Sequence, residues 1–403
     1  MQWFNTMKIG LLGFGTVGGG VGAIVLERQE QLKQLLGSPV EVVAALVKDV
    51  SEHKHTPFEH IVTEDVSKVI DHPEVEVIFE ALGGIELPFE WISRALKNKK
   101  HVITANKAVI CAHFQRLKAL ARENNVTLSV EACVGGGIPI ISTLSDHLLF
   151  GETTGIHGIL NGTGNYILSK IEKEQVSFLD ALSEAQALGY AEQVPDDDVD
   201  GFDASRKLLI LTALIHNAYF TLDQVFIASI RGVRPSDFER LKAEGKTLRY
   251  VVSCELQPSG DALFLAARPC VVPITSPFGQ TFGPDNTLVF EHSHLNQLSL
   301  KGPGAGKYPT ANAMIGDLIR LPMQVASSRR EPLAQNKQLV HHIEKHYYIR
   351  ANDAAIEALK SSGFLPSDAQ NDTQGHVVKT NRPWMLKNAL STHDSEGFLA
   401  EIL

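Results

Sequence analysis

The sequence predicts an α/β protein in which a domain with a parallel sheet precedes an α+β domain with a mixed sheet. Three observations support this prediction. Short apolar runs alternate with helical patterns up to about residue 142, a spacing typical of βαβ units with right-handed crossovers. A glycine-rich turn follows the first apolar run, and after about residue 142 the alternation changes to helices followed by strands.

The elements of the first domain, residues 1–142, are each marked by a local pattern. MKIGLLG, residues 7–13, is expected to form a short buried strand, and the glycine-rich stretch that follows it is expected to turn into a helix. The remaining strands are expected at 41–48, 75–82, 101–105 and 128–134, and helices at 88–99 and 112–125.

The second domain is expected over residues 143–304. A glycine turn and helix follow at 302–321, and we expect residues 305–328 to return to the first domain, since such units commonly cover a bound phosphate or nicotinamide. A polar linker then leads to a short C-terminal appendage, residues 346–403. Helices are predicted at 177–189 and 203–220, and strands at 247–256, 262–272, 286–292 and 347–350.

Composition narrows the class of protein. The 403 residues are 44% hydrophobic and 21% charged, which is ordinary for a soluble protein of two or three domains. The net charge of −9 and the lack of a long basic run argue against nucleic acid or an anionic membrane as partner. We see no membrane-spanning run, no secretory pattern and no metal-type spacing of the four cysteines, so we expect a cytoplasmic protein with reduced thiols.

The turn after the first strand reads GxGxxG, a pattern typical of dinucleotide binding. Its glycines permit a tight turn, a close approach of backbone to pyrophosphate, and close packing of the helix on the strand. At the end of the next strand, Lys48 favours NADP, whereas Asp49 leaves NAD open. The later KGPGAGKY resembles a phosphate-binding loop, but its glycine spacing and Tyr308 do not fit that motif. The six residues of the turn are Gly13, Phe14, Gly15, Thr16, Val17 and Gly18.

Two lysines are candidates for the proton transfer that accompanies hydride transfer. Lys107, in TANKA, follows the end of a parallel strand, where open α/β sheets bind ligands. Lys207 lies four residues after Asp203 on a predicted helix, so the two side chains share one face. Spacing alone favours an exposed ion pair for these two. They belong to the acidic stretch 190–207, which is a solvated loop, a metal site or a pocket for a cationic ligand.

The ordered set of motifs resembles the homoserine dehydrogenases over about residues 7–325. The motifs are GFGTVG, LGG, TANKA, EACVGGGIPII, LNGTGNYIL, LGYAE, DGFDASRK and GPGAG followed by PTA. The resemblance implies a homodimer that interconverts L-homoserine and L-aspartate 4-semialdehyde with NAD(P), on the route to threonine, methionine and isoleucine. The acidic stretch would then hold the ammonium group of homoserine.

The resemblance also assigns roles to single residues. Lys207 matches the family's proton donor in the reductive direction, and Lys107 matches a lysine near cofactor and substrate. Asn161, Gly162 and Thr163 line the substrate cleft or form a simple turn. The family's substrate acids match Glu192, Asp198 and Asp203, and further cofactor contacts match Gly83, Gly189, Gly304 and Gly306.

Two loops carry further expectations. The family's AEPDP is AEQVPDD here, and we interpret the extra Asp196, Asp197 and Asp200 as solvated loop acids, with a divalent-metal site as the alternative. EACVGGGIP resembles the family's monovalent-cation loop, usually occupied by sodium, with a helix-entry turn as the alternative. The cation ligands implied, mostly through main-chain oxygens, are Glu131, Val134, Gly136 and Ile138.

The sequence leaves open what type of domain the C-terminal segment forms and which of several functions the protein has. HYYIR resembles the first strand of a threonine-sensing ACT domain, but only about 58 residues remain and its Pro-Gly turn is missing, which leaves threonine feedback in doubt. Alternatives to homoserine dehydrogenase are another two-domain Rossmann oxidoreductase, such as a sugar-type dehydrogenase, and a nicotinamide-sensing regulator without turnover. An aspartate semialdehyde dehydrogenase would need a nucleophilic cysteine, for which only Cys133 is suitably placed.

Overall fold

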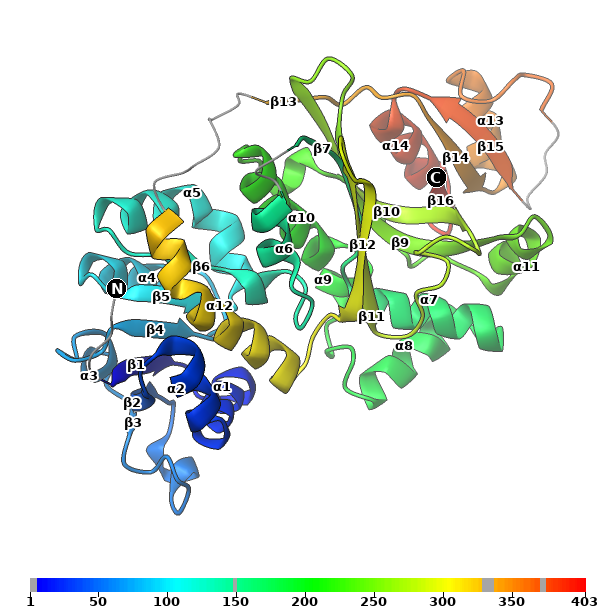
Figure 1. Ribbon diagram of the computed structural model, residues 1–403. Coiled ribbons are helices and arrows are strands. Elements are labelled where there is room, and N and C mark those ends of the chain that lie inside the picture. Colours follow the sequence, from blue (N-terminus) through cyan, green and yellow to red (C-terminus); the bar gives the residue numbers. More distant parts are fainter. Residues whose placement is uncertain (1–5, 148–150, 328–336, 370–374) are drawn as a thin grey trace. The chain divides into compact units, whose positions relative to one another are not determined.

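The computed structural model describes residues 6–147, 151–327, 337–369 and 375–403. The chain divides into two compact units, one of residues 1–146 and 303–333 and the other of residues 147–302 and 334–403 (Figure 1). Among the described residues, no helix has both the length and the apolar character needed to cross a membrane.

The first unit contains a parallel sheet whose strands are continuous apolar runs. Its order is β3-β2-β1-β4-β5-β6, the strand order of a Rossmann fold. Ile9, Leu11 and Leu12 of β1 are fully buried, as expected for a strand covered on both faces. The predicted parallel sheet is therefore confirmed. The strands are β1 Met7–Leu12, β2 Val40–Leu46, β3 Val62–Thr63, β4 Val77–Glu80, β5 His101–Thr104 and β6 Leu128–Ser129.

Helices cover this sheet, and one of them comes from far along the chain. α12 (Lys307–Ser327) packs against α1 (Thr16–Glu27) in the core that also holds β1, β2 and β4 (Figure 1). The contact is close because Gly20 lacks a side chain: a Cβ there would lie 3.0 Å from Ala311 Cβ. The other helices of this unit are α2 Gln29–Leu36, α3 Ser67–Ile70, α4 Glu86–Lys97, α5 Lys107–Glu123 and α6 Ile140–His147.

The second unit contains the predicted mixed sheet. Its order is β12-β11-β7-β9-β10-β16-β14-β15, with β8 and β13 pairing to β10. The long hairpin of β9 and β10 is buried along almost all of both strands, so it forms the centre of the unit. The strands before residue 340 are β7 Thr153–Ile159, β8 Phe226–Ile227, β9 Lys246–Leu256, β10 Ala262–Pro273, β11 Asp285–His292, β12 Asn296–Pro303 and β13 Gln338–Leu339. The helices are α7 Gly162–Glu174, α8 Phe178–Ala187, α9 Asp196–Val199, α10 Phe202–His216 and α11 Pro235–Ala243.

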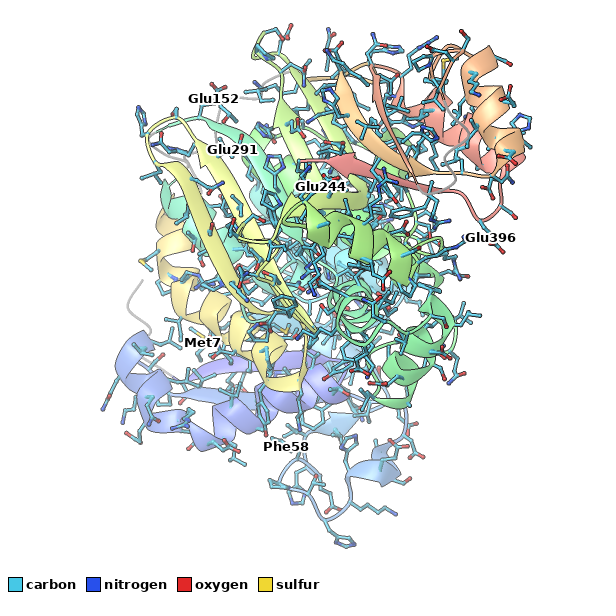
Figure 2. All side chains as sticks on the ribbon, turned by 90° about the vertical axis from the view of Figure 1, so that its right-hand side faces the viewer. Met7, Phe58, Glu152, Glu244, Glu291 and Glu396 are labelled. Atoms are coloured by element: carbon cyan, nitrogen blue, oxygen red, sulfur yellow. The ribbon has the colours of Figure 1, made fainter. Side chains whose placement is uncertain are left out.

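The C-terminal segment extends this sheet. Its last strand, β16 (Phe398–Ile402), pairs in parallel with β10, and a buried ion pair joins Arg268 of β10 to Glu401 of β16. Glu396, labelled in Figure 2, forms a further ion pair with Arg234. The ACT-like relationship of this segment stays a prediction. Its other elements are β14 Lys345–Arg350, α13 Asp353–Ser361, β15 His376–Thr380 and α14 Pro383–His393.

Candidate active site

The glycine turn after β1 leaves its backbone open. Gly13 has φ +94°, and a Cβ on Gly18 would lie 2.0 Å from Gly13 O, so only glycine fits at Gly18. A Cβ on Gly15, which precedes the first turn of α1, would meet nothing within 4 Å. Phe14 and Val17 pack into the core, so at these positions only main-chain atoms can reach a ligand. Exposed N–H groups at the start of α1 suit an anionic pyrophosphate.

The end of β2 carries the two residues expected to choose the cofactor. Lys48 and Asp49 are both exposed. Asp49 Oδ1 accepts a hydrogen bond of 2.7 Å from Ser51 N–H at the start of the 3₁₀ helix Val50–His53, and this bond lowers the Asp49 pKa. One oxygen of the acid is thus engaged locally, whereas Lys48 extends into solvent.

A buried carboxylate connects the ends of β4 and β5. Glu80, fully buried, accepts hydrogen bonds from Leu82 N–H at 2.8 Å and from the hydroxyl of Thr104. Asn106 Nδ2 lies 3.5 Å from the same carboxylate, and Asn106 Oδ1 caps α5, whose first residue is Lys107. Burial raises the pKa of Glu80 to about 7, against the effect of these donors.

Glu80 should make stability depend on pH. Its folded-state pKa of about 7 lies above the ordinary value of 4.5, so the unfolded chain loses this proton first as the pH rises. The free energy of unfolding should therefore fall between about pH 4.5 and pH 7, by about 3 kcal/mol at full effect. Urea denaturation should show that the free energy of unfolding of the wild type falls by this amount between about pH 4 and pH 8, relative to that of Glu80→Gln. Parallel profiles of the two proteins would contradict this expectation.

Cys133 is unsuited to nucleophilic chemistry. Its thiol is buried and donates to the carbonyl of Thr104 at 3.3 Å. Burial raises its pKa well above the ordinary value, and the nearby carboxylates of Glu80 and Asp317 act in the same direction. Because the thiolate is the reactive form, this environment argues against an aspartate semialdehyde dehydrogenase.

The glycine loop that resembles a cation site leads into α6, and the carbonyl of Ile138 there accepts from Ile140 N–H at 2.8 Å. The carboxylate of Glu131 accepts backbone hydrogen bonds from Ile141 at 2.7 Å and Ser142 at 2.8 Å and pairs with Arg320, so its side chain holds α6 in place. Val134 and Ile138 have buried side chains, and Gly136 has φ +56°. A donor set of carbonyls fits a hard cation, which prefers oxygen ligands. Gly304 lies against this loop, since a Cβ on Gly136 would be 2.5 Å from its carbonyl.

In the second unit, Lys207 and Asp203 form a buried ion pair. Nζ of Lys207 lies 2.8 Å from Asp203 Oδ2, and the two residues are only 8% and 5% exposed. The exposed pair that spacing favoured is therefore wrong, because α10 turns this face inward. Lys207 also donates to the carbonyl of Leu160 at 2.6 Å. An ammonium has three donors, so within the described chain one remains for a substrate oxygen.

Asn161 connects the acids around this lysine. Its Oδ1 accepts from Gly164 N–H at 2.6 Å and so caps α7. Its Nδ2 donates to Asp198 Oδ1 at 2.7 Å and to Asp203 Oδ2 at 3.0 Å. Burial raises the pKa of Asp198, and the bond from Asn161 opposes that shift. Sequence reasoning saw Asn161 only as a cleft or turn residue, although an asparagine before a glycine-rich helix start is a capping signal.

The remaining predicted substrate and cofactor residues make contacts of their own. Thr163 Oγ1 donates to the carbonyl of Tyr190 at 2.6 Å, and a Cβ on Gly162 would lie 2.7 Å from Pro284 O. Glu192 is exposed, and its main-chain carbonyl accepts from Gln186 Nε2 at 3.0 Å. Gly189, predicted for the cofactor, ends the turn after α8 in the second unit with φ +76°. Gly83 lies in the loop after β4, and Gly306 directly precedes α12.

The extra acids of the 190–207 stretch are paired with arginines. Asp196 and Asp200 bind Arg231, and Asp197 binds Arg206 at 2.7 Å. These acids are therefore ion-paired with arginines, and not only solvated as the sequence predicts. Among the described residues, no cluster of His, Cys, Asp and Glu has the arrangement of a metal site.

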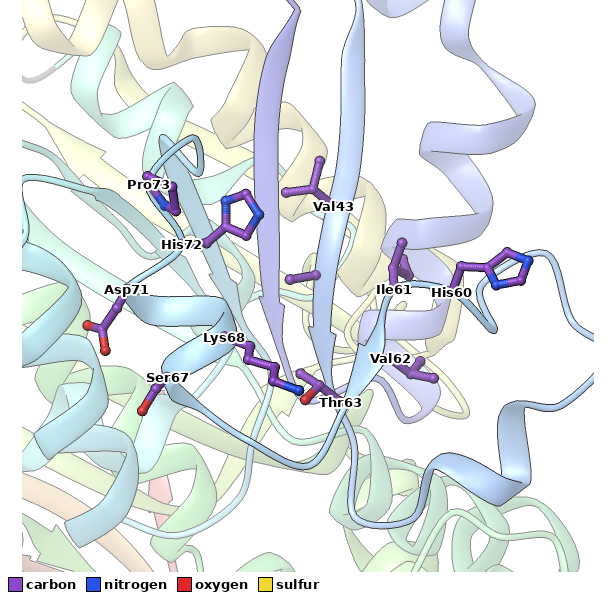
Figure 3. A pocket seen from close by; sticks show the side chains of 11 residues that line it. Val43, His60, Ile61, Val62, Thr63, Ser67, Lys68, Asp71, His72 and Pro73 are labelled. Atoms are coloured by element: carbon purple, nitrogen blue, oxygen red, sulfur yellow. The ribbon is translucent and has the colours of Figure 1, made fainter.

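A separate cavity of about 470 Å³ lies beside β2, β3 and α3 (Figure 3). Its lining includes His60, Thr63, Lys68 and His72. None of the predicted site residues lines it. It therefore has no part in the arrangement described above.

Comparison with known proteins identifies the family. A family model described as homoserine dehydrogenase matches residues 139–319, and one described as homoserine dehydrogenase, NAD binding domain matches residues 13–131. Homoserine dehydrogenase of Bacillus subtilis is 36% identical over 78% of this chain and 72% of its own length. That of Helicobacter pylori is 36% identical over 80% of this chain and 75% of its own length.

Solved structures agree with these matches over the whole chain. A homoserine dehydrogenase from Thiobacillus denitrificans superposes with a TM-score of 0.85 and 25% identity, covering 99% of this chain and 98% of that one. One from S. aureus gives a TM-score of 0.75 and 29% identity, with 99% of both chains covered. The glycine turn, the TANKA lysine and the buried lysine–aspartate pair therefore belong to a member of the homoserine dehydrogenase family, the NAD(P)-dependent oxidoreductases that act on the CH–OH group of homoserine.

Proposed function

We propose that the chain interconverts L-homoserine and L-aspartate 4-semialdehyde on the route to threonine, methionine and isoleucine, with Lys207 as the group that moves the proton. The observation that carries this proposal is the buried Lys207–Asp203 pair. A buried lysine with fixed acceptors is suited to a defined proton transfer, whereas an exposed one is not.

The acids near Lys207 bind the amino group of the substrate in this proposal. Asp198 and Asp203 are held by one amide, that of Asn161, and Glu192 lies on the loop that precedes α9. A bound ammonium would favour the ionised form of Asp198, whose pKa burial raises. Charge-assisted hydrogen bonds of this kind orient the substrate as well as holding it.

The remaining steps follow from what each side chain can donate or accept. A nicotinamide cofactor, when bound, would supply the acceptor for the hydride on the hydroxyl-bearing carbon of homoserine. Neutral Lys207 accepts the hydroxyl proton in that direction, and its ammonium returns a proton to the aldehyde oxygen in reduction. Lys107, the first residue of α5 in the first unit, is in this proposal a hydrogen-bond donor to the bound cofactor or substrate.

A sodium ion and a homodimer complete the proposal. Main-chain oxygens of Glu131, Val134, Gly136 and Ile138 would hold the ion, where it would stabilise the loop that leads into α6. The homodimer rests on the family resemblance, and light scattering should give twice the chain mass of 44.0 kDa. A mass of one chain at micromolar concentration would contradict it.

We propose NADP as the preferred cofactor, with NAD still accepted, because Lys48 is exposed at the end of β2 and Asp49 is partly engaged. A hyperthermophilic archaeal homoserine dehydrogenase of the same fold was solved with NADPH. Lys48→Ala should raise KM for NADP about tenfold and leave KM for NAD unchanged, because only NADP has a 2′-phosphate. Lys33→Ala, an exposed lysine on α2, is the matched control. Equal effects on both cofactors would contradict this role.

Steady-state absorbance at the reduced-nicotinamide band tests the function. Homoserine with NADP should give reduced cofactor. The analogue 4-hydroxybutyrate has the same alcohol and carboxylate but lacks the ammonium. Its kcat/KM should be lower than that of homoserine by a factor on the order of 100. No reduction of NADP or NAD by homoserine would end the enzyme proposal and favour a nicotinamide-sensing regulator.

A further inference from the structure

Glu80 is a buried acid that the proposed chemistry does not use. It ends β4 at the carboxyl edge of the parallel sheet, the edge that also carries the glycine turn and Lys107. Its partners come from two loops. Leu82 N–H belongs to the loop after β4, whereas Thr104 and Asn106 belong to the loop after β5.

The contacts continue from Glu80 to the start of α5. Thr104 Oγ1, which donates to Glu80, also accepts from Asn106 N–H at 2.9 Å. Asn106 Nδ2 donates to the carbonyl of Gly84 at 3.0 Å, and its Oδ1 accepts from Ala108 N–H and Val109 N–H at 3.1 Å each. The first turn of α5 is thus fastened to both loops through a single asparagine.

We propose that Glu80 is a positioning residue that fixes the first turn of α5 and thereby the direction of the Lys107 side chain. The part of this proposal that concerns catalysis rests on the proposed function. The groups that face Glu80 are donors: a backbone N–H, a hydroxyl and an amide NH₂. An acceptor with two oxygens satisfies all of them, and no apolar side chain can replace it.

Hydrogen–deuterium exchange of the peptides that carry residues 104–110 tests this directly. Glu80→Ala should accelerate exchange there at least about tenfold, because the capped amides of Ala108 and Val109 lose their fixed acceptor. Thr104→Val removes the same link without changing the carboxylate and should act in the same direction. Glu76→Gln is the control, since Glu76 is a half-buried acid just before β4 and should leave this exchange unchanged.

Kinetics with homoserine and NADP give the second readout. Misplacing a reacting group by about 1 Å costs on the order of 100-fold in rate, so kcat of Glu80→Ala should fall by about that factor. KM for NADP should change by a smaller factor than kcat, because Gly83 is the one predicted cofactor contact on the loop that Glu80 holds through Leu82, and the glycine turn itself is not substituted. Glu80→Gln keeps one acceptor oxygen and should recover part of kcat, a rescue that general destabilisation would not produce.

The two readouts separate this inference from the proposed function. Unchanged exchange at residues 104–110 in Glu80→Ala would overturn the positioning role, whatever the activity. Accelerated exchange with a wild-type kcat would overturn the link to Lys107. A wild-type protein that does not oxidise homoserine would refute the proposed function, while the exchange result would still decide whether Glu80 fixes α5.

Discussion

Replacing Lys207 with alanine should reduce turnover of homoserine at least about 1000-fold. Asp203 and the carbonyl of Leu160 hold the ammonium of Lys207 in a buried position. A lysine at the protein surface cannot take over its role, because it is not held there. General acid–base groups contribute about 100- to 10,000-fold, and loss of the ion pair also disturbs Asp203. Lys207 is not part of the glycine turn proposed to hold the pyrophosphate, so the dissociation constant for NADP should be unchanged.

The control for this experiment is Lys170→Ala. Lys170, on α7, also pairs with acids, namely Glu174 and Glu184, and is partly shielded. It lies outside the cluster around Asn161, so its loss should leave kcat within about twofold. Near-normal turnover of Lys207→Ala would remove Lys207 from the mechanism. Loss of NADP binding in that variant would show that the substitution acts through the fold.

Replacing Glu401 with alanine should destabilise the protein by about 3–5 kcal/mol. Arg268 and Glu401 are both fully buried, with a distance of 2.7 Å between Nη2 and Oε1. Lys345 Nζ lies 3.3 Å from the same Oε1. Removing the carboxylate leaves a guanidinium in a buried place without its principal partner, which is far costlier than losing a surface pair. Urea denaturation at neutral pH measures the effect.

Two further variants define what this pair does. Glu344→Ala breaks an exposed pair with Lys379 and should change stability by only a few tenths of a kcal/mol. Replacing both buried partners with apolar residues, Arg268→Met with Glu401→Leu, should recover most of the stability lost in Glu401→Ala. A small effect of Glu401→Ala, similar to that of Glu344→Ala, would mean that the C-terminal strand is not anchored by this pair.

The sequence predicted the first unit well because buried parallel strands are continuous apolar runs. β1, β2, β4 and β5 lie where those runs lie. The run at 128–134 gave only the two-residue strand β6 followed by the 3₁₀ helix Glu131–Cys133, and the glycines after the run form the loop into α6. In the second unit, β7, β12 and α7 were missed. β7 and α7 each contain two glycines, and β12 is largely polar and exposed, so tertiary pairing decides their structure.

The sequence indicated which residue types belong to the site, but it did not indicate how those residues contact one another. An i, i+4 spacing of Asp203 and Lys207 is the same in a surface pair and in a buried one, and only the packing of α10 distinguishes them. The hydrogen bonds from Asn161 to Asp198 and Asp203 join residues 37 and 42 positions apart in the chain. Glu80, Thr104 and Asn106 likewise meet only because β4 and β5 are neighbours in the sheet.

The most direct test of the central claim uses homoserine that carries deuterium in place of both hydrogens on its hydroxyl-bearing carbon. With NADP and the wild-type protein, mass spectrometry should find one deuterium in each molecule of reduced cofactor, together with the semialdehyde product. The Lys207→Ala variant should still bind the cofactor. It should form the deuterated reduced cofactor far more slowly than the wild type does. Reduced cofactor without deuterium, or no reduced cofactor with either NADP or NAD, would contradict the account.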